Sequence, residues 1–228
     1  MPIVLNVPCV RLHKLFLPHI MEFYAANKAV YDLCLNWQTL RPLERAQEAG
    51  LNLAREKKAS HILFVEDDHW GFPIDGLEVL LEADKEVVGF QTYKKTHPYT
   101  PFNFRKKDPH LSLITSQPNL QGFYQADGPE VQPCDLVTWA MMLVRTEVFD
   151  RLKINPFRES TRQTPTDSAF CQACLDVGIQ PHVHFGAIIG HGDVEPAEIP
   201  YRRWMADNIK SGRPLSEAMP RFGLEVAG

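Results

Sequence analysis

Short apolar runs alternate along this chain with longer stretches that carry apolar residues at helical spacing. The first pattern is typical of buried strands, and the second is typical of helices with one face packed on a sheet. Strands are predicted at 2–7, 60–65, 86–90, 135–144 and 181–185, and helices at 18–34, from Pro42 onward, and at 75–83, 147–152 and 167–177. These strands and helices alternate along the chain in βαβ order. That order predicts an α/β domain with a mostly parallel central sheet flanked by helices.

The sharpest change of pattern lies at residues 60–69, where an apolar run meets Glu66, Asp67, Asp68 and His69. Open α/β sheets bind ligands outside the carboxyl ends of their strands. In extended chain Glu66 and Asp68 would point one way and Asp67 the other. Clustered carboxylates repel one another, and hard oxygen ligands suit Mg²⁺ or Mn²⁺. We therefore predict a metal site here; the alternative is an acidic loop that only caps the following helix.

Other candidate residues lie near predicted element ends. Arg45 and Arg55 belong to a polar stripe on the helix after Pro42, which is either solvated surface or a face toward a bound phosphate. Asp167 falls in the first turn of a helix, where the helix dipole favours an ionised carboxylate, so it either serves a function or only supports the helix. His191 stands between two glycines after a predicted strand, where the chain can approach a ligand closely.

Residues 91–133 are interrupted by prolines and predict an irregular loop rather than long elements. Tyr93 and Lys94 open its basic, aromatic portion, which suits either the stacking of a sugar, base or phosphate or plain packing of a connector. Residues 200–228 predict a short amphipathic helix and a polar tail. The division expected is a catalytic domain at 1–199 and a helical tail at 200–228.

Composition narrows the classes of partner. The net charge of −4 provides no global basic field toward nucleic acid or membranes. No apolar run approaches the roughly 18 residues of a membrane span. The five cysteines are odd in number and no signal-peptide pattern opens the chain, so a cytoplasmic location is expected. Cys171 and Cys174 form one isolated pair that fits the apolar face of a helix better than a zinc or redox site.

Three segments resemble nucleotide-sugar glycosyltransferases of the GT-A fold, in the family-2-like superfamily. They are "RAQEAGLNLAREKKASHILFVEDD" from Arg45, "VTWAMMLVRTEVFDRL" from Val137 and "TPTDSAFCQACLDVGIQPHVHFGAIIGHGD" from Thr164. The first is similar to that family's arginine-bearing helix and the strand that ends in its Asp-x-Asp motif. The other two resemble the elements that flank the acceptor pocket and the acidic helix start followed by a late histidine. The resemblance implies a single GT-A-like (Rossmann-like) domain.

The resemblance also implies roles. Glu66 and Asp68 would bind the metal together with His191, and Arg45, Glu66 and Asp67 would bind the nucleotide. Asp167 would be the general base of an inverting enzyme, and Trp139 would contact the acceptor. Apart from the resemblance, the polar stripe offers Arg55 as a further nucleotide-binding residue, and the basic, aromatic loop, which matches no part of the family, offers Tyr93 and Lys94 as acceptor contacts. Four departures are visible. Glu66 stands where the family has an aspartate, and Arg45 lies two residues farther from Gly50 than the family's arginine does. Ala46 replaces an expected asparagine, and Trp139-Ala140 stands where a glycine is common.

The function implied is metal-dependent transfer of a sugar from a nucleotide-diphosphate donor, UDP-sugar above all, to an acceptor hydroxyl on a glycan, protein, small molecule or modified DNA base. Mn²⁺ or Mg²⁺ would stabilise the leaving diphosphate. Three alternatives stay open. The first is a metal hydrolase, which would use the acid cluster with His182, His184, His191 and Asp193. The second is a nucleotidyltransferase, which would usually show a glycine- and lysine-rich loop near the N-terminus; the sequence has no such loop. The third is a non-catalytic nucleotide- or sugar-binding module.

Overall fold

The protein is an α/β domain in a computed structural model that describes residues 1–10, 12–39, 42–93, 103–106, 120–122, 130–152, 157 and 166–192. Within 104–106 and 120–122 only the backbone is described. Lys94, Asp193 and the tail at 200–228 lie outside these residues. No helix among the described residues is long and apolar enough to cross a membrane.

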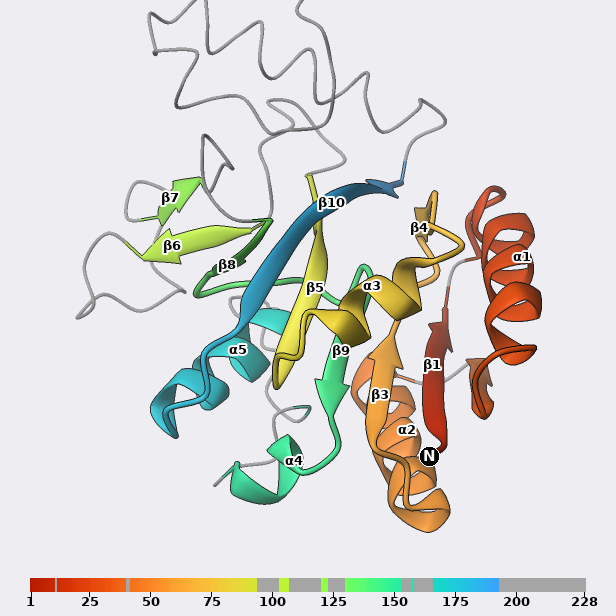
Figure 1. The fold of residues 1–228 in the computed structure, drawn as a ribbon, viewed down its shortest axis with the longest axis horizontal. Helices are drawn as coiled ribbons and strands as arrows, with labels where there is room; N and C mark the ends of the chain where they lie inside the picture. Colours follow the sequence, from red (N-terminus) through yellow and green to blue (C-terminus); the bar gives the residue numbers. More distant parts are fainter. Residues whose placement is uncertain are drawn as a thin grey trace, which may run out of the picture.

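A mixed sheet of eight strands forms the centre of the fold (Figure 1). Its strands run in the order β2-β1-β3-β9-β5-β10-β4, and β8 also pairs with β10. Their bounds are β1 Ile3–Cys9, β2 Leu33–Thr39, β3 His61–Phe64, β4 His69–Trp70, β5 Val87–Thr92, β8 Val131–Pro133, β9 Met142–Arg145 and β10 His182–His191. A separate antiparallel pair joins β6 (Phe104–Lys106) to β7 (Leu120–Gly122).

Helices cover both faces of the sheet (Figure 1). Helices α2 (Leu43–Lys57), α4 (Val148–Arg151) and α5 (Thr166–Asp176) bury apolar side chains in one core, together with Phe64 and Val183 of the sheet. Helices α1 (Phe16–Lys28) and α3 (Gly76–Glu82) cover the other face, where Leu63 and Val88 belong to a second core. Successive side chains of a strand point to opposite faces of the sheet, so each strand contributes to both cores. The strands are therefore apolar on both faces.

The prediction of a mostly parallel sheet is wrong. Strand β1 runs parallel to β2 and β3, and β5 runs parallel to β10. Strand β9 lies between β3 and β5 and is antiparallel to both, while β4 and β8 pair antiparallel with β10. Strand direction depends on the path of the chain between elements, and the apolar pattern of a buried strand is the same in either direction.

Three predicted elements have other bounds. The helix predicted at 18–34 ends at Lys28, and strand β2 follows from Leu33. The strand predicted at 135–144 is reduced to β9, because the chain before Met142 is a buried turn. Strand β10 continues to His191 through an irregularity between His184 and Ile188, beyond the predicted end of this strand at residue 185.

Candidate metal centre

Strand β3 ends before the acidic residues, and a turn places them. The backbone N–H of Glu66 donates to the carbonyl of Trp139 at 3.2 Å, and the N–H of His69 donates back to the carbonyl of Glu66 at 3.3 Å. Asp67 and Asp68 form the turn between these two bonds. The extended alternation predicted for the acids therefore does not occur, and each carboxylate has its own surroundings.

A short antiparallel pairing brings the end of β10 to this turn. His191 of β10 stands opposite His69 of β4, and Gly190 stands opposite Trp70. The N–H of Gly192 donates to the carbonyl of Asp68 at 2.7 Å. The imidazole rings of His69 and His191 stack with centroids 4.3 Å apart and planes 14° from parallel.

The carboxylate of Asp68 bridges the two imidazoles. Its Oδ1 lies 3.1 Å from His69 Nδ1 and its Oδ2 lies 3.4 Å from His191 Nε2. One ligand atom from each of the three residues lies within 4.8 Å of the others, so the group could hold a metal ion. When two ligand atoms each lie about 2.1 Å from the same ion, they are about 3.0 Å apart at an octahedral angle and about 3.4 Å apart at a tetrahedral angle. The distances from the Asp68 oxygens to the two histidine nitrogens are of this size.

The tautomer of His191 also suits a cation. Its Nδ1 lies 2.9 Å from the backbone carbonyl of Tyr93, and a carbonyl can only accept, so Nδ1 carries a proton. In the neutral ring, Nε2 then presents a lone pair toward the Asp68 carboxylate. Two lone pairs face each other there unless Nε2 is protonated or a cation lies between them. A backbone carbonyl on the far nitrogen is the common way to orient a metal-binding histidine.

Burial alone would raise the pKa of Asp68, but the hydrogen bonds and charges of His191 and His69 lower it far below its ordinary value. The carboxylate is therefore ionised throughout the physiological range. An ionised carboxylate between two imidazoles is a donor set for Mn²⁺ or Zn²⁺ more than for Mg²⁺, which prefers oxygen ligands alone.

The structure brings two of the three predicted ligands together, Asp68 and His191. Glu66 is outside the group, and His69 takes the third place. Asp67 instead holds the loop after β1: its Oδ2 accepts the N–H of Val10 at 2.6 Å. The sequence shows His69 next to the acids, but its role depends on the pairing of β4 with β10.

Asp167 lies at the start of α5 and is half-buried. Burial raises the pKa of Asp167 to about 6, against the lowering effects of the Ser168 N–H, which donates to Oδ1 at 2.7 Å, and of the His191 charge. The charge of His191 acts on Asp167, so the two side chains lie within electrostatic range of each other. The neighbouring residue Thr166 is fixed to the core, because its Oγ1 accepts the indole N–H of Trp139 at 3.0 Å.

Two residues predicted to contact an acceptor are buried instead. Trp139 is 1% exposed and packs on Phe64 and Phe170 in the core. Tyr93 is 2% exposed, clusters with Trp70, and offers its backbone carbonyl to His191. Both therefore position other groups of the site, and neither ring presents a surface to a ligand. Lys94 lies outside the described residues.

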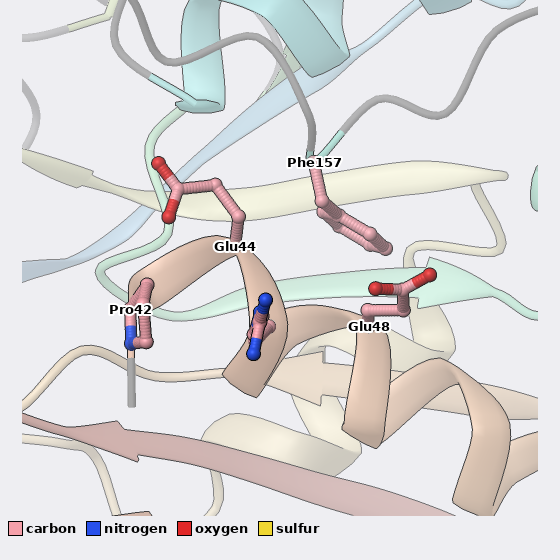
Figure 2. Close-up of a pocket in the computed structure, with 5 residues that line it drawn as sticks. Pro42, Glu44, Glu48 and Phe157 are labelled. Atoms are coloured by element: carbon pink, nitrogen blue, oxygen red, sulfur yellow. The ribbon is translucent and has the colours of Figure 1, made fainter. Parts of the chain in front are cut away.

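The two predicted phosphate-binding arginines lie apart from each other and outside the metal-ligand group. Arg45 lines an open pocket of about 520 Å³ at the start of α2. Figure 2 shows Glu44 and Glu48 projecting from α2 on the side where Phe157 lies. Arg55 is roughly 15 Å farther along α2, where it pairs with Asp150 of α4 at 2.7 Å on exposed surface. The structure does not bring Arg55 to the acids.

The histidines of the hydrolase alternative are also divided. His182 and His184 share one strand face as predicted, but neither belongs to the group around Asp68. Because a strand rises about 3.3 Å per residue, His184 lies roughly 20 Å from His191 along β10. Asp193 is outside the described residues.

Gly190 allows β10 to approach β4, and its replacement should damage the centre. A Cβ at Gly190 would lie 2.4 Å from Cε2 of Trp70, which is 7% exposed and cannot swing away freely. Gly190→Ala should lower the free energy of unfolding by about 1–3 kcal/mol and weaken metal binding, because His191 leaves its place opposite His69.

Gly178→Ala is the matched control for that prediction. Its φ of +78° penalises a side chain, by about 1–2 kcal/mol, yet nothing lies within 4 Å of the added Cβ. Chemical denaturation and Mn²⁺ titration should show similar losses of stability for both variants and a loss of metal affinity for Gly190→Ala alone. Equal metal affinity in the two variants would contradict the role given to Gly190.

Comparison with known proteins identifies the fold only. No family model matches the chain, and no curated protein matches it. Among solved structures, A197 from STIV is similar with a TM-score of 0.50, at 13% identity over 80% of this chain and 81% of that chain. A likeness at this identity shows the arrangement of the α/β elements and gives no activity.

Proposed function

We propose that this protein is a metal-dependent glycosyltransferase that moves a sugar from a nucleotide-diphosphate donor, UDP-sugar above all, to an acceptor hydroxyl. One observation carries the proposal: Asp68, His69 and His191 form a group after β3 that could hold a metal ion, and Asp167, with its raised pKa, lies within electrostatic range of His191. Ligand sites of α/β sheets lie at strand ends of this kind.

The three segments that resemble the GT-A family meet at this end of the sheet. The first segment contributes Glu66, whose N–H donates to Trp139 in the second. Trp139 in turn donates its indole N–H to Thr166 in the third. These two bonds tie the acid turn to the start of α5, so segments separated by up to a hundred residues position one another. That the three segments lie together in the fold supports the resemblance independently of the sequence similarity.

Asp68, His69 and His191 would hold the metal, which when bound would act as a Lewis acid on the departing diphosphate. Asp68 supplies the negative charge, and Tyr93 and Gly192 fix the two ends of the ligand group through backbone hydrogen bonds. Two imidazoles make Mn²⁺ a better match than Mg²⁺. The ligands thus favour a transferase that works with manganese.

Asp167 would accept the proton of the acceptor hydroxyl. A pKa of about 6 leaves the carboxylate ionised at neutral pH while making it a stronger base than an ordinary aspartate. Direct attack by the activated hydroxyl in one displacement would invert the anomeric carbon. The raised pKa separates this group from Asp68, whose pKa is lowered and which suits metal binding.

A metal hydrolase is the second candidate, because two imidazoles and one carboxylate also suit a catalytic metal that activates water. A hydrolase would use the Asp68 group alone, since His182 and His184 belong to another part of β10. A nucleotidyltransferase or a non-catalytic binding module has no observation of its own in its favour.

The test is a panel of nucleotide sugars incubated with the protein and Mn²⁺, with release of the nucleoside diphosphate as the readout. We expect release from UDP-sugars that stops when EDTA removes the metal, with water taking the place of the unknown acceptor. Arg55→Ala should behave as the parent, because Arg55 lies away from the acids. Cleavage of simple phosphoesters without any release from nucleotide sugars would favour the hydrolase and overturn the proposal.

A further inference from the structure

Three buried polar side chains around the carboxyl end of β5 have polar atoms without a partner. Gln91 and Asn103 are 0% exposed, and Thr138 is 5% exposed. Within the part of the chain that the structure describes, nothing forms a hydrogen bond with either polar atom of the Gln91 amide, with Nδ2 of Asn103 or with Oγ1 of Thr138. A buried polar group without a partner is costly, so a cluster of them points to a ligand that would satisfy them.

The side chain of Gln91 points toward the face of the sheet that α5 covers. Successive side chains of a strand point to opposite faces. Val88 and Phe90 belong to the core on the side of α1 and α3. Gln91 therefore points to the other face, as does Val87, which belongs to the core that includes α5.

Gln91 lies at about the level of Asp167 in the layer between β5 and α5. Val137 marks a lower level of this layer: its Cγ2 is 2.7 Å from a Cβ built at Gly89, and its carbonyl accepts from Cys171 Sγ at 3.3 Å. Helix α5 leads back to the start of β10, which is parallel to β5 (Figure 1). From the Val137 contacts, Gln91 is roughly 6.6 Å along β5 and Asp167 roughly 6 Å along α5 in the same direction.

Asn103 and Thr138 border the same end of β5. The N–H of Phe90 donates to the carbonyl of Met141 at 3.2 Å, on the edge of β5 that pairs with β9. The next N–H on this edge, that of Thr92, lies past the start of β9 and donates to Oδ1 of Asn103 at 3.2 Å. Thr138 belongs to the buried chain that leads into β9. Asn103 and Thr138 lie in connecting segments, so movement of these segments would open the group to a ligand and leave the sheet intact.

The unpaired atoms are uncharged and include both donors and acceptors. The amide nitrogens of Gln91 and Asn103 donate, Oε1 of Gln91 accepts, and the hydroxyl of Thr138 does either. A carboxylate or phosphate only accepts and would leave Oε1 of Gln91 unpaired, whereas an ammonium group only donates and would leave both amide nitrogens unpaired. A sugar hydroxyl donates and accepts at once, so neighbouring hydroxyls of a sugar match this group.

We propose that Gln91, together with Asn103 and Thr138, binds hydroxyl groups of the transferred sugar and sets the specificity for it. The inference rests on the proposed function. Tyr93, two residues after Gln91, holds His191 of the metal-ligand group through its carbonyl at 2.9 Å. The amide of Gln91 thus lies between the strand end that positions the metal-ligand group and the level of Asp167, where a sugar passing from diphosphate to acceptor would be.

Gln91→Met tests the proposal, because methionine is apolar and similar to glutamine in length and branching. Gln47→Met is the matched control: Gln47 is also 0% exposed, and both atoms of its amide lack a partner among the described residues. Gln47 lies in α2 one turn before Gly50, which packs against Asn6 of β1. Strand β1 is three positions from β5 in the sheet, roughly 14 Å away.

Calorimetric titration with UDP and with UDP-glucose, both in Mn²⁺, is the measurement, and urea unfolding accompanies it. Gln91→Met should bind UDP as the parent does and UDP-glucose about tenfold or more weakly than the parent, since two or more hydrogen bonds are lost. Gln47→Met should bind both ligands as the parent does. Neither variant should unfold at a lower urea concentration, because each removes unpaired polar atoms from the interior.

Three results would overturn the inference while the proposed function stands. They are parent-like binding of UDP-glucose by Gln91→Met, an equal loss of affinity for UDP and UDP-glucose in that variant, and unfolding of Gln91→Met alone at lower urea, which would show that its amide is paired within the fold. A parent that binds no UDP in Mn²⁺ would overturn the proposed function and this inference with it.

Discussion

Replacing Asp68 with alanine should weaken Mn²⁺ binding by more than about a hundredfold, because loss of a group that only supports a ligand already costs about 10–100-fold. Asp68 is the one carboxylate of the metal-ligand group and lies next to both imidazoles, at 3.1 and 3.4 Å. Without it, His69 and His191 present two neutral nitrogens to a divalent cation. The free-Mn²⁺ signal in electron paramagnetic resonance, followed during titration with protein, measures the affinity.

Glu66→Ala is the matched control. Glu66 belongs to the same acid run but not to the ligand group, so its removal should change the Mn²⁺ affinity only a few-fold by weakening the local negative field. Loss of binding in Glu66→Ala as large as the loss in Asp68→Ala would contradict the assignment. It would favour the strand-like arrangement that the sequence predicts, in which both carboxylates face the metal, over the turn seen in the structure.

Asp167→Asn should lower the turnover of the proposed reaction by roughly 10²–10⁴-fold, the range for loss of a general base. In the parent, kcat/KM should rise with pH and level off above the pKa of Asp167, which is about 6. The variant should lose this dependence. Initial rates of sugar transfer from pH 5 to 8, with metal saturating, measure both effects.

The same substitution should stabilise the fold above pH 6. The pKa of Asp167 is about 6 in the folded chain against an ordinary value of 3.8, so between these values the folded state holds a proton that the unfolded state has lost. Ionising the half-buried carboxylate therefore costs the folded state on the order of 1–2 kcal/mol at pH 8, after discounting for its partial exposure to solvent. Urea unfolding of Asp167→Asn should show a gain of that size at pH 8 and little gain at pH 4.

If Asp167→Asn loses activity but gains stability, Asp167 is a functional group whose ionised form destabilises the folded protein. A residue that only supports the helix would give the contrary result, with stability lost on substitution and transfer reduced only in proportion to unfolding. A non-catalytic binding module would show the change in stability and no reaction to lose.

Much of the fold follows from local pattern. The helix after Pro42 and the strands at β1 and β5 have long or clean apolar patterns, and the structure places elements there. Strand β2 was missed because Asn36 and Gln38 interrupt its apolar face and Cys34 fits the end of the preceding helical spacing. The antiparallel direction of β9 has no local signal, since both of its faces are buried.

The candidate site was predictable where chemistry is local in sequence and not where it depends on distant pairing. Asp68 was predicted as a metal ligand from the strand end; the glycines that flank His191 predicted close approach to a ligand, and the family resemblance implied its metal role. His69 becomes a ligand only because β4 pairs with β10, whose residues lie far along the chain. Glu66 was expected on the side of Asp68, but the chain turns before alternation can put it there.

Calorimetry with UDP, with and without Mn²⁺, on the parent and on Asp68→Ala tests the central claim most directly. A nucleotide-sugar transferase with its metal at Asp68 should bind UDP in the presence of Mn²⁺, bind it weakly without the metal, and lose the metal-dependent binding in Asp68→Ala. Binding of Mn²⁺ without any binding of UDP would point to the hydrolase. If the parent binds neither, the acid turn serves the fold alone and the proposed function is wrong.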